Sequence, residues 1–250
     1  MADKIKQDIE GNNNLQQQII VQGDNNNYIG LKTEDVISII KAFCYTDEEQ
    51  IVSIVKETIE SINEEQRRMP DKRIFVPIIQ QLSYSMDDEY IKNLYKNLLK
   101  ASMDKNKNVH PSFVMIINQL NADEIKLLNT IPPVTGISKP LIDVRMIIGN
   151  QPGLGYQHIS NFSDISYGVC ENPGMICSYV ENLERLKLIE IPTGVKISDD
   201  SVYEKLKSHP AIINELNKNK SSDKINISYE FDKKLFRLTQ FGYQFLMCCK

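Results

Sequence analysis

His110 and Ser112 are the residues of this sequence that come nearest to catalytic machinery, because a histidine beside a serine could act as a base toward a nucleophile. Histidine also exchanges protons readily near neutral pH. However, His110 precedes Pro111, and proline is favoured in the first turn of a helix. We therefore favour His110 as the boundary residue of a helix. Neither a nucleophile elbow nor a zinc-binding H-E-x-x-H motif accompanies the pair.

Three consecutive acids, Asp87, Asp88 and Glu89, could bind a metal ion through their carboxylates. They also stand at the start of a predicted helix, where carboxylates accept hydrogen bonds from unpaired N–H groups and interact favourably with the helix dipole. We expect caps rather than metal ligands. His158 and His209 have no cysteine or histidine at the spacing that metal ligands need.

The other chemistry-bearing residues also lack a recognisable pattern. The five cysteines are scattered, without C-x-x-C pairs, at Cys44, Cys170, Cys177, Cys248 and Cys249. Gly153-Leu154-Gly155 could belong to a phosphate-binding loop, but neither G-x-x-x-x-G-K-[ST] nor G-x-G-x-x-G is present. The sequence therefore predicts no catalytic, cofactor-binding or metal-binding residue, and we expect a protein that is not an enzyme.

Composition and charge narrow the class of protein. The chain has 250 residues, of which 41% are hydrophobic and 25% charged, as in ordinary globular proteins. Residues 1–135 hold 15 basic against 20 acidic side chains, and residues 136–250 hold 14 against 13. Neither half has the basic excess of a typical nucleic-acid binder. The sequence lacks both an apolar run of about 18 residues and an apolar signal segment, so we expect a cytoplasmic protein without a membrane span.

Helical periodicity dominates residues 32–131, which we predict to form a helical domain. Its centre is the stretch from Val76 to Leu120. Apolar residues recur there along one side of a helix, at Tyr90, Ile91, Leu94, Tyr95, Leu98 and Leu99. Further helices are predicted at 33–43, 46–62 and 75–82, and others from starts at 85–88, 110–111 and 121–123. We expect these helices to pack around the stripe.

Residues 1–31 form an Asn/Gln-rich arm. The segment Gly11-Asn-Asn-Asn returns twelve residues later as Gly23-Asp-Asn-Asn-Asn, and β-prone residues follow each copy. Two such units could make a β-hairpin, which is marginal alone and would gain stability by pairing with copies from other chains. This homo-oligomerisation would use Asn13, Ile19, Val21, Asn25, Asn27 and Tyr28. A flexible polar arm without a role in the fold is an equally weighted alternative.

The second half of the chain has a different order of elements. Residues 132–170 are rich in proline and glycine and predict a junction with one short β-prone piece at 141–148. Residues 171–250 predict a helix at 173–186, a strand at 188–191, an insertion at 200–222, strands at 225–231 and 235–238, and a last helix capped by Thr239. This order is typical of a winged-helix module. The predicted fold class is mainly α (α+β), with a helical domain followed by a winged-helix-like domain.

Six motifs between residues 74 and 249 support a family resemblance. They are Val76–Ile79, Leu82–Tyr84, Leu94–Leu99 with Ala101–Asp104, His110–Phe113, Asn182–Ile189 and Phe236–Leu246. In these motifs the chain resembles the Abi-alpha family of bacterial abortive-infection proteins. The resemblance implies a role in phage defence, and it brings no catalytic motif with it.

Two functions follow as hypotheses. The resemblance and the arm favour a non-enzymatic defence protein that self-assembles and binds a protein partner. The alternative is a winged-helix DNA-binding regulator, whose exposed helix would offer Ser178, Asn182 and Arg185 to DNA or to a partner. Glu181 and Glu184 lie on the same helix and would face phosphates unfavourably. Nucleic acid is therefore the less favoured partner, and no cofactor is expected.

Overall fold

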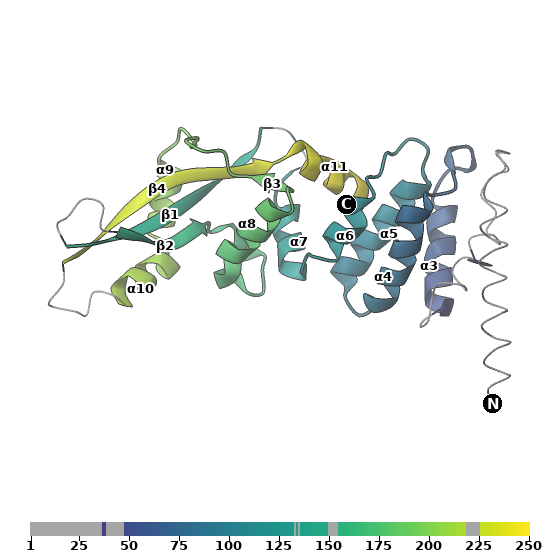
Figure 1. Ribbon diagram of the computed structural model, residues 1–250, viewed down its shortest axis with the longest axis horizontal. Coiled ribbons are helices and arrows are strands. Elements are labelled where there is room, and N and C mark those ends of the chain that lie inside the picture. The colour runs from purple at the N-terminus through teal and green to yellow at the C-terminus, as the bar shows by residue number, and fades with distance from the viewer. Residues whose placement is uncertain (1–36, 39–47, 133, 135, 150–154, 219–225) are drawn as a thin grey trace, which may run out of the picture. The chain divides into compact units, whose positions relative to one another are not determined.

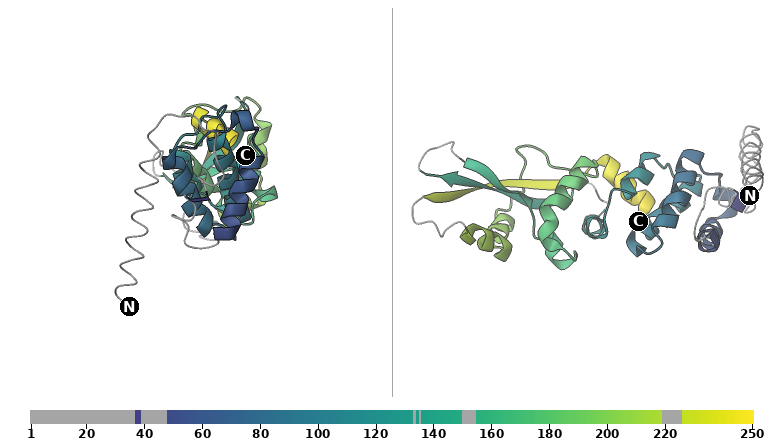
Figure 2. Two further views of the ribbon diagram at one scale, coloured as in Figure 1. Left: turned by 90° about the vertical axis from the view of Figure 1, so that its right-hand side faces the viewer. Right: turned by 60° about the horizontal axis from the view of Figure 1, so that its bottom comes forward.

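The computed structural model describes residues 37–38, 48–132, 134, 136–149, 155–218 and 226–250 (Figures 1 and 2). The expected class is confirmed, because these residues are mainly helical and include a four-stranded antiparallel sheet. The chain divides into two compact units, residues 1–120 with 248–250 and residues 121–247. Apart from residues 37–38, the Asn/Gln-rich arm and the helix predicted at 33–43 lie outside the described ranges. Within those ranges, no helix combines the length and apolar character needed to cross a membrane.

The first unit packs around the stripe predicted from the sequence. Its elements are α3 (Glu48–Glu60), the 3-10 helix η1 (Glu64–Gln66), α4 (Lys72–Tyr84), α5 (Glu89–Met103) and α6 (Ser112–Ile117). On α5, Leu94, Tyr95, Leu98 and Leu99 are buried, whereas Tyr90 is exposed. The stripe is therefore core from the second turn of α5 onward.

Acidic residues begin two helices of this unit. The Asp71 carboxylate accepts a hydrogen bond from the Arg73 backbone N–H at 2.8 Å, so α4 starts earlier than predicted and Pro77 lies inside it. Asp88 caps α5 by accepting a hydrogen bond from the Tyr90 N–H at 3.0 Å. The predicted capping role of the acids at 87–89 is therefore confirmed at Asp88.

Arg68 joins the segment before α4 to the end of α5. Its backbone N–H donates to the Met103 carbonyl at 2.8 Å, and its Nε donates to the Ser102 carbonyl at 2.9 Å. Its Nη2 reaches the Lys107 carbonyl at 2.8 Å. Three hydrogen bonds from this one residue thus hold residues 102–107, which begin within the Ala101–Asp104 motif.

The second unit combines the sheet with helices. Its elements are α7 (Ala122–Asn129), β1 (Ser138–Ile148), β2 (Gly155–Phe162), η2 (Ile165–Gly168), η3 (Pro173–Met175), α8 (Ile176–Arg185), β3 (Ile189–Glu190), α9 (Ser201–Lys207), α10 (Pro210–Lys218), β4 (Ile227–Leu238) and α11 (Gln240–Cys249), whose last two residues belong to the first unit. The strand order is β2-β1-β4-β3, and every neighbouring pair is antiparallel. Helix α8 packs on β2, and α9 packs on β1 (Figure 1).

The prediction of a junction at residues 132–170 is wrong. This stretch supplies β1 and β2, and β1 pairs with β4 along its whole length from Ser138 to Ile148. Ile142 and Val144 are buried in the sheet, while Gly136 and Gly149 adopt positive φ angles of 91° and 71° at the ends of β1. The glycines mark turns around a strand rather than a linker. The two strands predicted at 225–231 and 235–238 are likewise one continuous strand, β4.

A bulge distorts β2 where it faces the middle of β1. Asn161 has a φ of 56°, and the register shifts between Ile142 and Val144. The Asn161 N–H donates to the Asp143 carboxylate at 2.8 Å, and Lys234 Nζ donates to Asp143 Oδ2 at 3.0 Å and to Asn161 Oδ1 at 2.6 Å. These bonds hold the unpaired residue of the bulge, which increases the local twist of the sheet.

The two later family motifs meet in space. Lys187 ends α8 with a φ of 59°, and the Thr239 hydroxyl donates to its carbonyl at 2.5 Å. The same hydroxyl accepts the Gly242 N–H at 2.8 Å, which confirms Thr239 as the cap of α11. A Cβ added to Gly242 would lie 1.9 Å from the Leu188 carbonyl oxygen. The threonine and the glycine therefore allow α11 to approach the α8–β3 connection closely.

Candidate functional site

The candidate site of the second unit starts at the N-terminus of α7. Asn121 caps this helix: its Oδ1 accepts the Glu124 N–H at 2.9 Å, and Glu124 Oε2 accepts the Asn121 N–H at 2.9 Å. Of the two start residues that the sequence suggested, Asn121 is thus the cap. Asp123 lies in the first turn of α7, but its carboxylate binds groups outside this helix.

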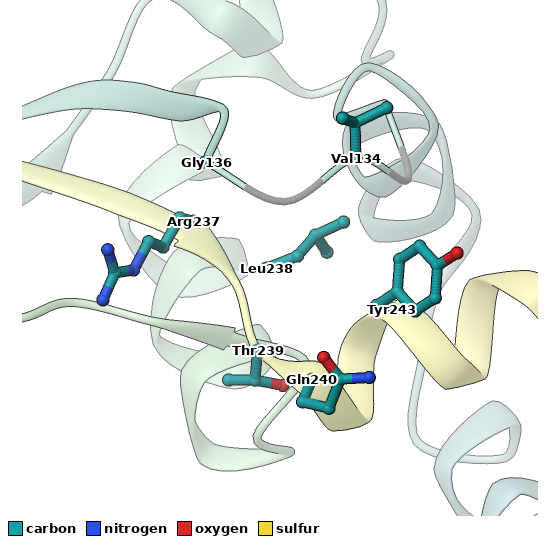
Figure 3. A pocket seen from close by; sticks show the side chains of 7 residues that line it. All are labelled: Val134, Gly136, Arg237, Leu238, Thr239, Gln240 and Tyr243. Carbon is teal, nitrogen blue, oxygen red and sulfur yellow. The ribbon is translucent and has the colours of Figure 1, made fainter.

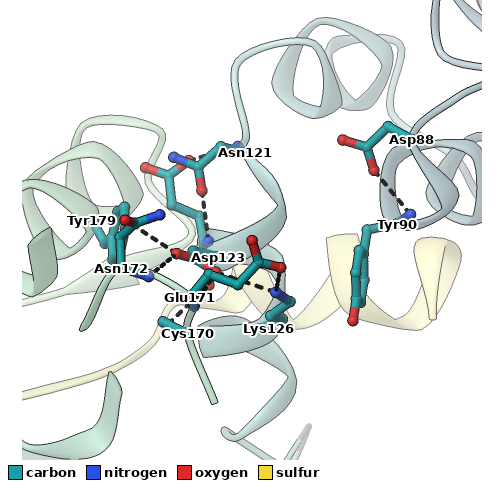
Figure 4. Close-up of polar contacts among 10 residues, drawn as sticks. Asp88, Tyr90, Asn121, Asp123, Lys126, Cys170, Glu171, Asn172 and Tyr179 are labelled. Atoms are coloured by element: carbon teal, nitrogen blue, oxygen red, sulfur yellow. Dashed lines mark hydrogen bonds and ion pairs between the residues drawn. The ribbon is translucent and has the colours of Figure 1, made fainter. Parts of the chain in front are cut away.

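Asp123 is buried, with 6% of its surface exposed, and its carboxylate organises a polar network (Figure 4). Oδ1 accepts the Glu171 backbone N–H at 2.9 Å, and Oδ2 accepts the Asn172 backbone N–H at 2.8 Å and the Tyr179 hydroxyl at 2.9 Å. Lys126 Nζ lies 3.3 Å from Oδ1 and also donates to Glu171 at 2.7 Å. A residue of α7 therefore binds backbone groups located 48 and 49 positions later in the chain.

The network changes the acidity of its members. Burial by itself raises the pKa of Asp123, but the hydrogen bonds from Glu171, Asn172, Tyr179 and Lys126 outweigh it and lower the pKa to about 2. Burial and the bond to Asp123 raise the pKa of Tyr179 to about 12. At neutral pH Asp123 is therefore an anion and Tyr179 a neutral donor. All of these groups are already engaged, so the network is suited to holding structure rather than to transferring protons.

We predict that this network makes stability sensitive to acid. Because the pKa of Asp123 in the folded protein lies below the usual value of 3.8, its contribution to stability is present above about pH 4 and is lost as pH falls toward 2. Burial raises the pKa of Glu124 in the folded state, so Glu124 acts in the opposite direction and favours folding at lower pH. In urea unfolding, the wild type should lose about 1.3 kcal/mol more stability than Asp123→Asn between about pH 4 and 2.5. Equal slopes for the two proteins would contradict this role of Asp123.

The segment held by Asp123 runs from Asp164 to Met175, which we call the 164–175 loop. Inside it, the Ser166 side chain is fully buried and donates to the Pro173 carbonyl at 2.9 Å, while the Ser166 carbonyl accepts the Cys170 N–H at 2.9 Å. Together with the two bonds from Asp123, these contacts fix the loop at residue 166 and at residues 170–173. The only regular structure of the loop is two short 3-10 turns, η2 and η3. Its backbone is held mainly by the buried side chains of Asp123 and Ser166.

The 164–175 loop exposes three apolar side chains. Tyr167, Val169 and Met175 are 40%, 39% and 51% exposed. Tyr167 packs one side of its ring on His209, with ring centroids 4.3 Å apart, which orients it. The acidic residues Asp164 and Glu171 are exposed on the same loop.

The residues predicted to contact DNA or a partner lie on α8. Ser178 and Arg185 are exposed, and Asn182 is half-buried. Asn182 Nδ2 donates to Glu124 Oε1 at 2.8 Å, and the guanidinium of Arg185 donates to Asn182 Oδ1 at 2.6 and 3.1 Å. The structure therefore brings Asn182 and Arg185 together and links them to α7. Ser178 is not among the residues joined by these hydrogen bonds.

His110 occupies the boundary position that the sequence suggested. It is exposed, and its Nδ1 lies 2.6 Å from Ser112 Oγ and accepts the Ser112 N–H at 3.2 Å. A ring nitrogen that accepts a backbone N–H at a helix start acts as a cap. His209 does the same at the start of α10, where its Nδ1 accepts the Ala211 N–H at 3.2 Å.

One of the four described cysteines touches the network, because Cys170 Sγ donates to the Asp123 backbone carbonyl at 3.5 Å. Cys170, Cys177, Cys248 and Cys249 carry free thiols, and burial raises the pKa of Cys177 to about 11, which makes it a poor nucleophile at neutral pH. The residues predicted for oligomerisation all lie outside the described residues: Asn13, Ile19, Val21, Asn25, Asn27 and Tyr28. Cys44, Gly153 and Leu154 also lie outside them, whereas Gly155 is described.

A pocket of about 220 Å³ lies where β4 leads into α11 (Figure 3). Its lining comprises Val134, Gly136, Arg237, Leu238, Thr239, Gln240 and Tyr243. The Arg237 Nε donates to Glu190 Oε1 at 2.7 Å, and Thr239 is the cap of α11. The side chains of Arg237 and Thr239 at this pocket therefore already serve the fold.

Sequence reasoning missed Asp123, Lys126 and Tyr179 as a set. An acid in the first turn of a helix has the pattern of a cap, and nothing in its neighbours indicates that its partners lie near residues 171 and 172. The one available signal was that Asn121 and Asp123 competed for one capping position, which left a carboxylate without a role.

Comparison with known proteins places this architecture in a family. The chain matches the family described as abortive infection alpha over residues 46–249, and it belongs to that family. A solved structure of an uncharacterized protein from the hydrocarbon-degrading marine bacterium Alcanivorax borkumensis SK2 is similar over 57% of this chain and 97% of its own, at 16% identity and a TM-score of 0.35. That score is too low to define a shared fold, and no curated protein matches the chain.

Proposed function

We propose that this protein acts in abortive infection against phage by binding a protein partner, without catalysing a reaction. Family membership over residues 46–249 supports the defence role. The network around Asp123 supports the mode of action, because it uses a buried carboxylate to hold an exposed apolar loop. Rigid presentation of apolar side chains lowers the entropy cost of binding a partner.

The side chains with chemical potential support the non-enzymatic part of the proposal. Asp88 and His110 serve helix starts, and Asp123 is occupied by four donors. A general base needs an accessible acceptor within reach of its substrate. Both carboxylate oxygens of Asp123 are committed to the fold, and Asp88 Oδ1 and His110 Nδ1 accept N–H groups at helix starts.

The proposal is tested by deleting the gene in its native host and infecting at a high ratio of phage to cells. Abortive infection predicts that cells with the gene die without releasing a full burst, whereas cells without it release normal numbers of phage. Equal bursts from both strains, for every phage that infects the host, would argue against the defence role.

Self-assembly through the Asn/Gln-rich arm is a further part of the proposal. It rests on the repeated β-prone units in residues 11–29, which need pairing to be stable. We predict that the full chain elutes as an oligomer in size-exclusion chromatography with light scattering at micromolar concentration, and that a chain starting at Leu31 elutes as a monomer. If both chains are monomers, the arm does not drive assembly.

A winged-helix-like module that binds DNA remains the second candidate, with weaker support. Asn182 and Arg185 bond to each other and to Glu124, and Glu181 is exposed on the same helix. An acid on a reading helix repels phosphates. Salt-sensitive binding of the full chain to duplex DNA at low ionic strength would favour this candidate over the proposed one.

A further inference from the structure

We propose that the 164–175 loop is the partner-binding surface and that it recognises a protein segment with a large apolar residue flanked by lysine or arginine. This inference rests on the proposed function, which it makes specific. It starts from the three exposed apolar side chains Tyr167, Val169 and Met175. Large apolar side chains grouped on one short loop are unusual on a solvated surface and are typical of interaction sites.

The backbone of the loop is preorganised, so it needs little ordering when a partner binds. Asp123 fixes the N–H groups of Glu171 and Asn172, and Ser166 fixes Pro173. The apolar side chains flank these fixed points. Interfaces gain affinity when anchor residues are held in their bound arrangement before contact.

The charges around the apolar side chains define the chemistry of the occupant. Asp164 and Glu171 are exposed on the loop, and Glu181 is exposed on α8, which begins directly after it. Residues 164–175 include no lysine or arginine. Lys126 is only 13% exposed and is bonded to Asp123 and Glu171, and Arg185, the exposed cation of α8, is bonded to Asn182. The exposed charged side chains of the loop itself are therefore acidic, which attracts cationic side chains and repels nucleic-acid phosphates.

The test is a selection from a random library of peptides of about twelve residues, displayed on yeast, with the full chain as the target. Affinities of the selected peptides are then measured by fluorescence anisotropy against three proteins. These are the wild type, a loop variant with Tyr167→Ser, Val169→Ser and Met175→Ser, and a matched variant with Ile148→Ser, Tyr156→Ser and Val195→Ser. The matched residues have similar exposure in the same unit.

We expect enriched peptides to carry an apolar residue flanked by Lys or Arg, to lose at least about tenfold in affinity for the loop variant, and to bind the matched variant within about twofold of the wild type. A second variant, Asp164→Lys with Glu181→Lys, changes only exposed side chains and should weaken the same peptides severalfold, most strongly at low salt. It keeps the test decisive if the loop variant does not fold.

Three results would overturn the inference: no peptide is enriched, the enriched peptides are acidic, or they bind the loop and matched variants equally well. A change in oligomeric state of the charge variant would also overturn it, because the loop would then contact a second copy of the chain. Gene deletion decides the defence role separately, so a failed selection with a normal deletion phenotype rejects the loop and leaves the proposed function standing.

Discussion

Replacing Asp123 by alanine is expected to lower the free energy of unfolding of the 121–247 unit by about 3 kcal/mol. The variant leaves the Glu171 and Asn172 N–H groups and the Tyr179 hydroxyl without their acceptor, and it leaves Lys126 with one anionic partner instead of two. Buried donors that lose their partner cost more free energy than the bond itself contributes, because water does not replace the acceptor.

Denaturant unfolding measures the total effect, and amide hydrogen exchange at Glu171 and Asn172 measures the local one. Both amides should exchange much faster in Asp123→Ala. Asp164→Ala is the matched control, because it removes an exposed carboxylate of the same loop and should change stability by less than about 0.5 kcal/mol. Unchanged exchange at the two amides in Asp123→Ala would show that the network does not hold the loop.

Replacing Gly242 by alanine is expected to destabilise the same unit by about 3 kcal/mol or more. The added Cβ would stand 1.9 Å from the Leu188 carbonyl oxygen and 2.7 Å from its carbon, and these are backbone atoms that cannot rotate away. Helix α11 would have to move from the α8–β3 connection, which would stretch the bonds of Thr239 to Lys187 and Leu188. Loss of these bonds adds to the steric cost.

Gly168→Ala is the control for this prediction. No heavy atom lies within 4 Å of a Cβ at Gly168, so the substitution should leave stability nearly unchanged. Thermal unfolding of both variants against the wild type gives the comparison. Equal unfolding temperatures for Gly242→Ala and the wild type would mean that α11 does not approach Leu188 as closely as described.

The elements that the sequence predicted well are those with strong local signals. The apolar stripe of α5 has helical spacing, and Asp88 and Thr239 stand where caps are needed, so each could be found from its neighbours. Pro210 begins α10, and proline is favoured at the first position of a helix. Local patterns of this kind depend on a few adjacent residues.

The sheet and the network depend on contacts between distant residues and could not be found in this way. The strands β1 and β2 lie among glycines and prolines that predicted a junction, because turn residues outnumber the short apolar runs there. Asp123 meets residues 171 and 172 only because α7 and α8 pack together in the fold. No spacing rule connects positions so far apart.

The measurement that tests the central claim most directly is phage protection in the native host with two sets of variants expressed at wild-type levels. One set is the loop variant Tyr167→Ser, Val169→Ser, Met175→Ser with its matched control. The other is His110→Asn and Ser112→Ala, which remove the imidazole and the hydroxyl while asparagine can still accept the N–H at the start of α6. We expect the loop variant to lose protection, and we expect His110→Asn and Ser112→Ala to keep it. Full protection by the loop variant, together with loss of protection in His110→Asn or Ser112→Ala, would contradict the account and indicate a chemical activity.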